Sequence, residues 1–445
     1  MSDRTHQSTL TATEDEELDT IDWTFPAADT QYLTHGLHTY PARMIPQIPD
    51  ALLNHFLDHS EIEEGDTVYD PFSGSGTTAV EARLHGLNAK ANDINPFACM
   101  LTKAKAIPIE RPTLDAAYRD LRSDLKLELR KLTETYESDE EIEIDLPAVR
   151  DGWFPEPQLQ HLAHIRDEIS ALEENYSEEV VRFFRVVLSK VTRRTSYQRN
   201  GEFKRYRMAP EDREDHDPDV YALFTDKVEE NISLMGSYSD RVDSDLDTDV
   251  YYADSRKAED IGDNSVDIVI TSPPYGDHGT TVAYGQFSQD PAIVADRREY
   301  DEMRNVDKEG LGGSASELAD LDDLEDRSPS LAETIEVLDE KDGRAQDALD
   351  FFTDYYAVME QVVRVTKPGQ PVAWVVANRT MSRVNIPTHL ITYELCLDIG
   401  YEHEATLPRE IPQKTLPWEN APENTPGVKG DLMANENIVV VRAPE

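Results

Sequence analysis

The segment Val266-Asp267-Ile268-Val269-Ile270-Thr271-Ser272-Pro273-Pro274-Tyr275 predicts a strand followed by a rigid loop. Its near-continuous apolar run is typical of a parallel strand that is buried on both faces. Ligands of open α/β sheets bind just beyond the carboxyl ends of the strands, where Ser272 to Tyr275 would lie. The two prolines fix φ and donate no backbone N–H, so the loop is stiff and its carbonyl groups remain available as acceptors. A rigid acceptor beside the flat face of Tyr275 suits a planar base with an exocyclic amine, although a turn with an aromatic plug would use the same residues.

A glycine-rich turn in residues 67–81, TVYDPFSGSGTTAVE, is the second signal. A short strand leads into the turn, and a helix is expected from about Thr77. Gly74 and Gly76 allow positive φ and let a ligand approach the backbone, while the helix N-terminus attracts negative charge. No lysine precedes Thr77, so this is not a triphosphate-binding loop, and it also differs from the strict G-x-G-x-x-G pattern.

Acidic or polar residues are expected at the carboxyl ends of four successive strands. Residues 88–95 read as a strand that ends at Asp93, 19 positions after Gly74, where a carboxylate can accept from ribose hydroxyls. Asp93 could instead only cap the next helix. The residues at the four strand ends are Asp70, Asp93, Asp254 and Ser272. This is the arrangement of a ligand crevice.

The order of the segments predicts an α/β fold with a doubly wound, mostly parallel, seven-stranded sheet and a helical insertion. We expect a flexible acidic tail over residues 1–30 and one α/β domain formed by residues 31–105 and 249–445. Residues 106–248 interrupt the α/β rhythm and are expected to be mainly helical. Residues 288–345 are acidic and poor in apolar runs, which predicts a surface insertion within the α/β domain.

A basic segment over residues 182–207 contains nine basic residues and one acidic residue, Glu202. Arginines interleaved with aromatic side chains suit phosphate contact and base stacking, so residues 106–248 are a candidate DNA-recognition region. The candidate DNA contacts are Arg193, Arg194, Arg199, Lys204, Arg205 and Arg207. The alternative is an internal strip of salt bridges on an acidic body.

The charge of the chain is strongly negative, with 90 acidic and 43 basic residues and a net charge of −47. Such an imbalance normally argues against a nucleic-acid partner, or for disorder. A halophilic composition is a third explanation, because near-molar salt shortens the Debye length to roughly 3 Å and screens the repulsion. We favour this explanation, since periodic apolar segments run through most of the chain, and it weakens the objection to DNA.

Several classes of protein are disfavoured by what the sequence lacks. It has no apolar stretch of roughly 18 residues and no N-terminal signal peptide, so we expect a cytoplasmic protein without a membrane partner. The two cysteines, Cys99 and Cys396, cannot form a structural zinc site alone, and no metal is expected.

Together, these segments resemble the DNA amino-methyltransferases that use S-adenosylmethionine. The resemblance covers about residues 31–105 and 249–442 and implies a Rossmann-like methyltransferase sheet. It implies that the Phe72-Ser-Gly-Ser-Gly76 loop binds the methionine end of the cofactor, that Asp93 binds ribose, and that Asp254 contacts the adenine amine. Residues 41–46, PARMIP, resemble the motif that packs over the methionine moiety. The implied cofactor-binding residues are Pro41, Asp70, Phe72, Gly74, Gly76, Thr77, Asp93 and Asp254.

The same resemblance implies that Ser272, Pro273, Pro274 and Tyr275 are catalytic. Ser in the first position is more typical of members that act on cytosine N4, whereas Asp or Asn is more typical of adenine N6. We therefore expect site-specific methyl transfer to the N4 amine of a flipped-out cytosine in double-stranded DNA. Cytosine C5 chemistry would need a cysteine after a proline, and neither cysteine fits.

The biological setting and the alternatives stay open at this point. The expected role is restriction-modification or host DNA marking, with a cognate restriction endonuclease as a partner. The Thr271-Ser-Pro-Pro-Tyr275 set, together with the acidic composition, also resembles archaeal enzymes for CTAG sites, as in haloarchaea. The alternatives are an adenine-N6 enzyme, an RNA methyltransferase, and a non-catalytic DNA-binding protein that kept the cofactor fold.

Overall fold

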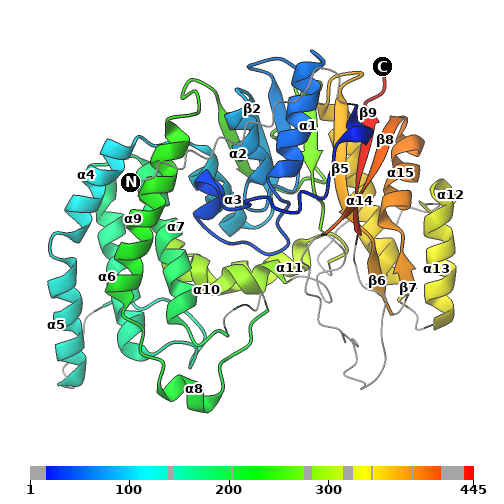
Figure 1. The fold of residues 1–445 in the computed structure, drawn as a ribbon. Coiled ribbons are helices and arrows are strands. Elements are labelled where there is room, and N and C mark those ends of the chain that lie inside the picture. Colours follow the sequence, from blue (N-terminus) through cyan, green and yellow to red (C-terminus); the bar gives the residue numbers. More distant parts are fainter. Residues whose placement is uncertain are drawn as a thin grey trace.

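The structure is a computed structural model that describes residues 17–138, 144–199, 201, 204–274, 283–313, 324–341, 344–382, 384–411 and 435–445. One sheet has the strand order β3-β2-β1-β4-β5-β9-β8. Its strands are β1 Thr67–Asp70, β2 Asn88–Asp93, β3 Thr248–Tyr252, β4 Ile268–Thr271, β5 Pro371–Ala377, β8 Glu402–Glu410 and β9 Asn435–Arg442. Neighbours are parallel except at β9, which is antiparallel to β5 and β8. The expected α/β, mostly parallel, seven-stranded sheet is confirmed (Figure 1).

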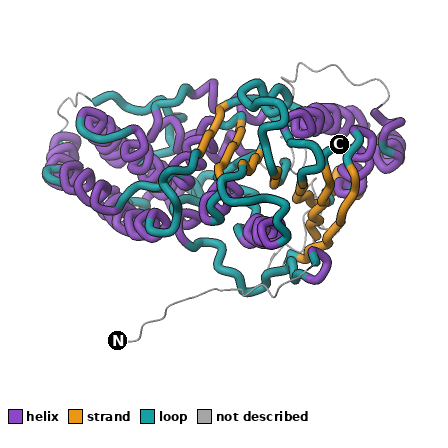
Figure 2. Tube along the Cα trace, turned by 90° about the horizontal axis from the view of Figure 1, so that it is seen from above, coloured by secondary structure: helices purple, strands orange, loops and turns teal. Residues whose placement is uncertain are grey.

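Both faces of this sheet are apolar. Along β5, Ala373 and Val375 belong to one core, whereas Val372 and Trp374 belong to a second core on the other face. The alternation follows from the two-residue period of a strand, and it obliges helices to cover both faces. Figure 2 shows helices on either side of the strands. The helices of the first core include α1 Gln47–Asp58 and α2 Thr77–Leu84, and those of the second are α12 Leu324–Arg327, α13 Pro329–Lys341, α14 Ala345–Val365 and α15 Thr388–Ile399.

Residues 106–248 form a group of helices beside the sheet (Figure 1). They follow α3 Pro96–Ala106 and comprise α4 Arg111–Arg122, α5 Leu125–Glu137, α6 Glu156–Ala171, η3 Leu172–Glu174, α7 Glu178–Thr195, α8 Pro210–Glu214 and α9 Val220–Ser239. The amphipathic α7 lies at the centre and packs against α3, α6, α9 and α10. Its apolar side chains, such as Phe183 and Val186, therefore tie the inserted helices to the α/β domain.

The structure differs from expectation at the start of the acidic segment 288–345. Helix α10, Tyr284–Asp296, is largely buried against α7 and α3, and α11, Tyr300–Glu309, packs against it. Phe287 and Ile293 supply apolar contacts in this interior. Even Asp290 is buried, because Arg205 forms an ion pair with it over 2.9 Å. Arg205, which is distant in the sequence, thus supplies the positive charge that allows an acidic residue of α10 to be buried.

The N-terminal segment also differs from the expected flexible tail. Residues 1–16 lie outside the described part of the chain, but η1, Leu18–Thr20, contacts β8. Leu18 and Trp23 are buried, and the Trp23 indole donates a hydrogen bond to the Leu18 carbonyl over 2.9 Å. These apolar side chains hold the segment to the domain and lead it into η2, Leu33–Gly36.

Two minor features complete the fold. Strands β6, Arg379–Met381, and β7, Val384–Ile386, pair as a separate two-stranded sheet. In the part of the chain that the structure describes, no helix combines the length and the apolar character needed to cross a bilayer.

Candidate active site

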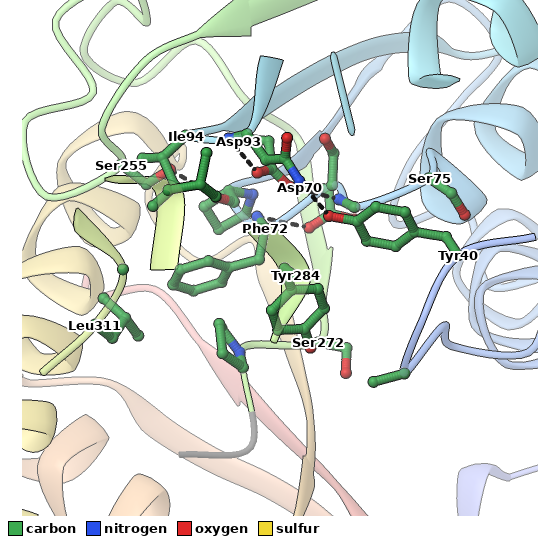
Figure 3. Close-up of a pocket in the computed structure, with 18 of the residues that line it drawn as sticks. Tyr40, Asp70, Phe72, Ser75, Asp93, Ile94, Ser255, Ser272, Tyr284 and Leu311 are labelled. Carbon is green, nitrogen blue, oxygen red and sulfur yellow. Dashed lines mark hydrogen bonds between the residues drawn. The ribbon is translucent and has the colours of Figure 1, made fainter. Parts of the chain in front are cut away.

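The predicted strand-end residues meet at one edge of the sheet. β1 ends at Asp70, β2 ends at Asp93, and Ser272 directly follows β4. Asp254 lies two residues after the end of β3. Since β3, β2, β1 and β4 are neighbours in this order, their carboxyl ends surround a single cavity of about 1100 Å³, counting its part open to solvent. The predicted site residues that line it are Pro41, Asp70, Phe72, Gly74, Thr77, Asp93, Asp254, Ser272 and Pro274 (Figure 3).

Three predicted residues are not among those that line this cavity. Tyr275 lies outside the described residues. Pro273 belongs to the same loop as Ser272 but is not part of the wall. Gly76 precedes α2 with a φ of 80°, and a Cβ there would lie 2.9 Å from the Thr102 Cα atom. Gly76 thus permits close packing of α2 on α3.

Carboxylates at the strand ends hold the glycine loop in place. The Asp93 Oδ2 atom accepts a hydrogen bond from the Gly74 N–H over 2.9 Å, and its Oδ1 atom accepts from the Asn95 N–H over 2.8 Å. Burial raises the pKa of Asp93 to about 7. Each oxygen can still accept a further hydrogen bond, so the bonds to the loop leave Asp93 able to receive a ligand hydroxyl.

Asp70 links β1 to β4 beneath the same loop. Its Oδ1 atom accepts from the Thr271 hydroxyl over 2.6 Å and from the Phe72 N–H over 3.0 Å. Burial raises the pKa of Asp70 to about 6. Because Thr271 is the residue before Ser272, this contact fixes the start of the Ser-Pro-Pro loop relative to the glycine loop.

Asp254 is held by an ion-pair network. The Arg256 guanidinium contacts the Asp254 carboxylate over 2.8 Å and the buried Asp354 carboxylate of α14, also over 2.8 Å. Arg256 also donates to the Glu309 carbonyl over 3.0 Å. The network joins β3, α11 and α14 and fixes the direction in which Asp254 can accept a hydrogen bond from a ligand.

Two tyrosines that the sequence analysis did not select also line the cavity. Tyr40 stacks on Tyr284, the first residue of α10, with ring centroids 5.8 Å apart and planes 27° apart. Asn95 donates to the Tyr40 hydroxyl over 3.0 Å and to the Ser288 hydroxyl over 2.8 Å. Figure 3 shows Tyr284 near Ser272, with Leu311 on the opposite side of the cavity from Tyr40. No motif marks these positions, because the contacts join segments about 240 residues apart.

A third residue that the sequence analysis did not select is Ser255. Its buried hydroxyl donates to the Pro71 carbonyl over 2.6 Å, which ties the loop after β3 to the loop after β1. A serine beside the predicted Asp254 is the one hint that the sequence offered.

The predicted DNA contact set divides into side chains with internal contacts and side chains exposed to solvent. Arg205 lies over the Trp153 ring at 4.3 Å and pairs with Asp290, and Arg193 lies over the Phe287 ring at 4.1 Å. Burial lowers the pKa of Arg193 to about 10. These two arginines make the internal contacts that the alternative interpretation expected. Lys204 is half-buried, and the exposed members are Arg194, Arg199 and Arg207, the last of which also donates to the Gly152 carbonyl over 3.0 Å.

Known proteins match this chain over its length. A family model described as DNA methylase matches residues 5–104. The chain is 34% identical over 435 residues to the Type II methyltransferase M.MvaI of Kocuria varians, covering 94% of this chain and 93% of that protein. It is 23% identical over 405 residues to the Type II methyltransferase M.BsoBI of Geobacillus stearothermophilus, covering 79% and 76%. A solved structure, the rRNA methyltransferase aviRa of Streptomyces viridochromogenes, aligns with 92% of this chain and 89% of its own at 10% identity, but its TM-score of 0.30 supports no inference.

The sheet and its cavity define the class of protein: a methyltransferase that uses S-adenosylmethionine. More particularly, the chain belongs to the DNA amino-methyltransferase family, because M.MvaI matches it from end to end. DNA is therefore its substrate and S-adenosylmethionine its methyl donor.

Proposed function

We propose that this protein is a site-specific DNA methyltransferase that transfers a methyl group from S-adenosylmethionine to the N4 amine of a flipped-out cytosine in duplex DNA. The observation that carries the proposal is that Ser272 and Pro274 line the same cavity as Gly74 and Asp93. The expected acceptor loop and the expected donor loop thus face one chamber, as direct transfer between two bound groups requires.

The residues of the cavity fit the methyl donor. Asp93 and Asp254 are carboxylate acceptors for ribose hydroxyls and an adenine amine, and Phe72 and Leu311 supply apolar surface. Gly74 has a φ of 51° and no side chain, so its backbone can lie against a ligand. When bound, S-adenosylmethionine supplies an electrophilic methyl group on its sulfonium.

The Ser-Pro-Pro loop provides fixed acceptors for the target amine. Flipping a base out of the duplex costs a few kcal/mol. The Ser272 hydroxyl and the Pro273 carbonyl accept hydrogen bonds from the N4 amine, and Tyr275 stacks on the base. These bonds draw the nitrogen lone pair out of conjugation with the ring, and acceptors fixed in advance favour the charge that develops in the transition state. The enzyme forms no covalent intermediate.

Cytosine N4 is favoured over adenine N6 by Ser272, which stands where N6 enzymes more often have Asp or Asn. The Type II designation of M.MvaI and M.BsoBI supports a role in restriction-modification or host DNA marking, with a cognate restriction endonuclease as partner. We propose CTAG as the target site, from the resemblance of residues 271–275 and the acidic composition to archaeal enzymes for CTAG sites. Lys204 and the exposed Arg194, Arg199 and Arg207 are the phosphate contacts of the basic segment.

Nucleoside analysis of DNA from a host that expresses the protein tests this proposal. Digestion followed by mass spectrometry is expected to yield N4-methylcytosine, and sequencing with modification detection is expected to locate it at a single short site. DNA from a host expressing the Ser272→Ala variant is the control. N6-methyladenine in place of N4-methylcytosine, or unmethylated DNA, would overturn the proposal.

A further inference from the structure

A second cleft lies on the other side of the segment that covers the cofactor cavity. Tyr40, Ala42 and Arg43 line both hollows, so residues 40–43 form a common wall. The second cleft has a volume of about 1400 Å³, counting its part open to solvent. Its basic lining side chains are Arg43, Lys190, Arg193, Arg194 and Arg199. None of the described residues that line it is acidic, although the chain contains 90 acidic residues.

Four cations in or beside this cleft, Arg43, Lys105, Lys190 and Arg194, differ in their contacts from other cations of the chain. Arg256, Arg297 and Arg298 each form ion pairs. Among the described residues, by contrast, no carboxylate oxygen lies within 4 Å of the cationic nitrogens of the group Arg43, Lys105, Lys190 and Arg194.

The two best-buried members of this group bond to backbone carbonyls. Arg43 donates to the carbonyls of His35 and Thr30, over 3.0 and 3.2 Å. Lys105, which is fully buried, donates to the carbonyl of His38 over 3.2 Å. Neutral acceptors satisfy the hydrogen bonds but leave the positive charges uncompensated.

The proximity of these cations is unfavourable for the charged forms of the lysines among them. Burial lowers the pKa of Lys190 to about 8, and the nearby Lys227 and Arg194 lower it further, while Glu230 opposes the shift. Burial, followed by Arg43 and Lys190, lowers the pKa of Lys105 well below its usual range. Mutually repelling cations in a half-buried hollow favour the binding of an anion, which offsets the repulsion.

The position of the cleft identifies the anion. A base that reaches Ser272 brings its own backbone to the rim of the cofactor cavity, and the cleft begins across the wall formed by residues 40–43. Arg194 is exposed, so a duplex can reach it, whereas Lys190 lies one helical turn earlier on α7, half-buried. A phosphodiester group has the charge and the acceptor oxygens that these side chains require.

We propose that this cleft binds a phosphodiester of the DNA strand whose base enters the neighbouring cavity, with Arg43, Lys190 and Arg194 as its contacts. The inference rests on the base flipping of the proposed function. It assigns Arg43 and Lys190, which lie outside the predicted DNA contact set, to DNA binding, while Arg193 and Arg205 keep their internal contacts.

The test compares the double variant Lys190→Gln/Arg194→Gln with the wild-type protein. The measurement is the salt dependence of binding to a duplex that contains the methylated site. Because the double variant loses its contact with one phosphate, the slope of log K against log salt is expected to become shallower by about 0.9. The variant Arg119→Gln/Lys131→Gln removes the same charge from exposed positions on α4 and α5, and its slope is expected to equal that of the wild type.

Two further measurements separate phosphate binding from general damage. The charge-preserving variant Lys190→Arg/Arg194→Lys is expected to keep the wild-type slope, and the affinity for S-adenosylmethionine is expected to stay unchanged in all variants. In a series of duplexes, a neutral methylphosphonate replaces one phosphate at a time beside the methylated base. The wild type is expected to bind more weakly when one particular phosphate of this series is replaced. The variant Lys190→Gln/Arg194→Gln is expected to bind that modified duplex and the unmodified duplex with equal affinity.

The two proposals fail in distinguishable ways. If the wild type methylates DNA but the Gln double variant keeps its slope and its sensitivity to the methylphosphonate, the cleft does not bind the phosphate and the proposed function stands. If the wild type neither binds nor methylates the duplex, both proposals are overturned.

Discussion

The carboxylate of Asp93 accepts a hydrogen bond from the backbone N–H of Gly74 over 2.9 Å, so the end of β2 holds the loop that follows β1. Its other oxygen accepts from the Asn95 N–H. The residue expected to bind the ribose of the cofactor therefore also shapes the loop expected to bind its methionine end.

This double role predicts the effect of Asp93→Asn. The amide group must turn its NH2 toward one of two backbone donors, so one hydrogen bond is lost at a cost of about 1–3 kcal/mol. We expect the affinity for S-adenosylmethionine to fall about tenfold or more, as measured by titration calorimetry. Asp249→Asn, at an exposed position on the neighbouring strand, is the control and should bind normally. Equal affinities for the two variants would contradict the assignment.

Ser272→Ala tests the acceptor loop separately from cofactor binding. Loss of one fixed polar group in a transition-state pocket typically lowers kcat by about 10²–10³-fold. We expect a loss of this size in methyl transfer to duplex DNA, with unchanged affinity for S-adenosylmethionine, because Asp70 anchors the start of the loop through Thr271. A Ser272→Ala enzyme with full turnover would remove Ser272 from the reaction.

Arg205 is expected to affect stability more than DNA binding. Arg205→Gln removes the cation that pairs with the buried Asp290 and leaves it only the nearby Arg193. Breaking a buried pair typically costs about 3–5 kcal/mol, and Arg193 places the expected loss toward the lower end. Urea denaturation should show this loss, and adding Asp290→Asn should recover part of it. If Arg205→Gln instead weakened DNA binding at unchanged stability, the internal role would be wrong.

Gly76→Ala separates backbone strain from steric conflict when it is compared with Gly65→Ala. Both glycines have positive φ, 80° and 88°, and a left-handed conformation costs a non-glycine residue about 1–2 kcal/mol. A Cβ on Gly76 meets the Thr102 Cα atom at 2.9 Å, whereas nothing lies within 4 Å of one on Gly65. We therefore expect Gly76→Ala to lower the free energy of unfolding clearly more than Gly65→Ala. Equal losses would mean that α2 and α3 can separate freely.

The buried contact between Glu81 and His35 predicts a pH dependence of stability. Burial raises the pKa of Glu81 to about 8 and lowers that of His35, so their 2.6 Å contact is a hydrogen bond between neutral groups near pH 7. Tyr32 also donates to Glu81 over 2.6 Å.

The carboxyl of Glu81 has a pKa of 4.5 in the unfolded chain and about 8 in the folded protein. Its protonation therefore stabilises the folded protein fully below pH 4.5, and this stabilisation is lost as the pH rises through about 8. Glu81→Gln does not titrate. Its free energy of unfolding relative to the wild type should therefore increase from pH 5 to pH 9, as followed by urea denaturation at each pH. A difference that stays constant with pH would show that Glu81 is ionised throughout.

Much of the cofactor side of the site could be predicted from local sequence. A short run of apolar and β-branched residues that ends at a polar residue predicts a strand end, so the positions of Asp70 and Ser272 followed from their own neighbours, and that of Asp93 from its spacing to Gly74. The stacked pair Tyr40 and Tyr284 could not be found in this way, because neither residue carries a local signal and their contact depends on how α10 docks.

The sequence by itself determined the α/β class, the order of the strands along the chain and the residues at their carboxyl ends, because periodicity and strand termination are short-range properties. Only the tertiary structure decided which basic residues turn inward and which surround a cleft. Arg205 pairs with Asp290, 85 positions away, while Arg43 and Lys190 approach the same hollow from distant segments. The electrostatic environment of a side chain in the folded protein depends on such long-range neighbours, and these neighbours cannot be predicted from composition alone.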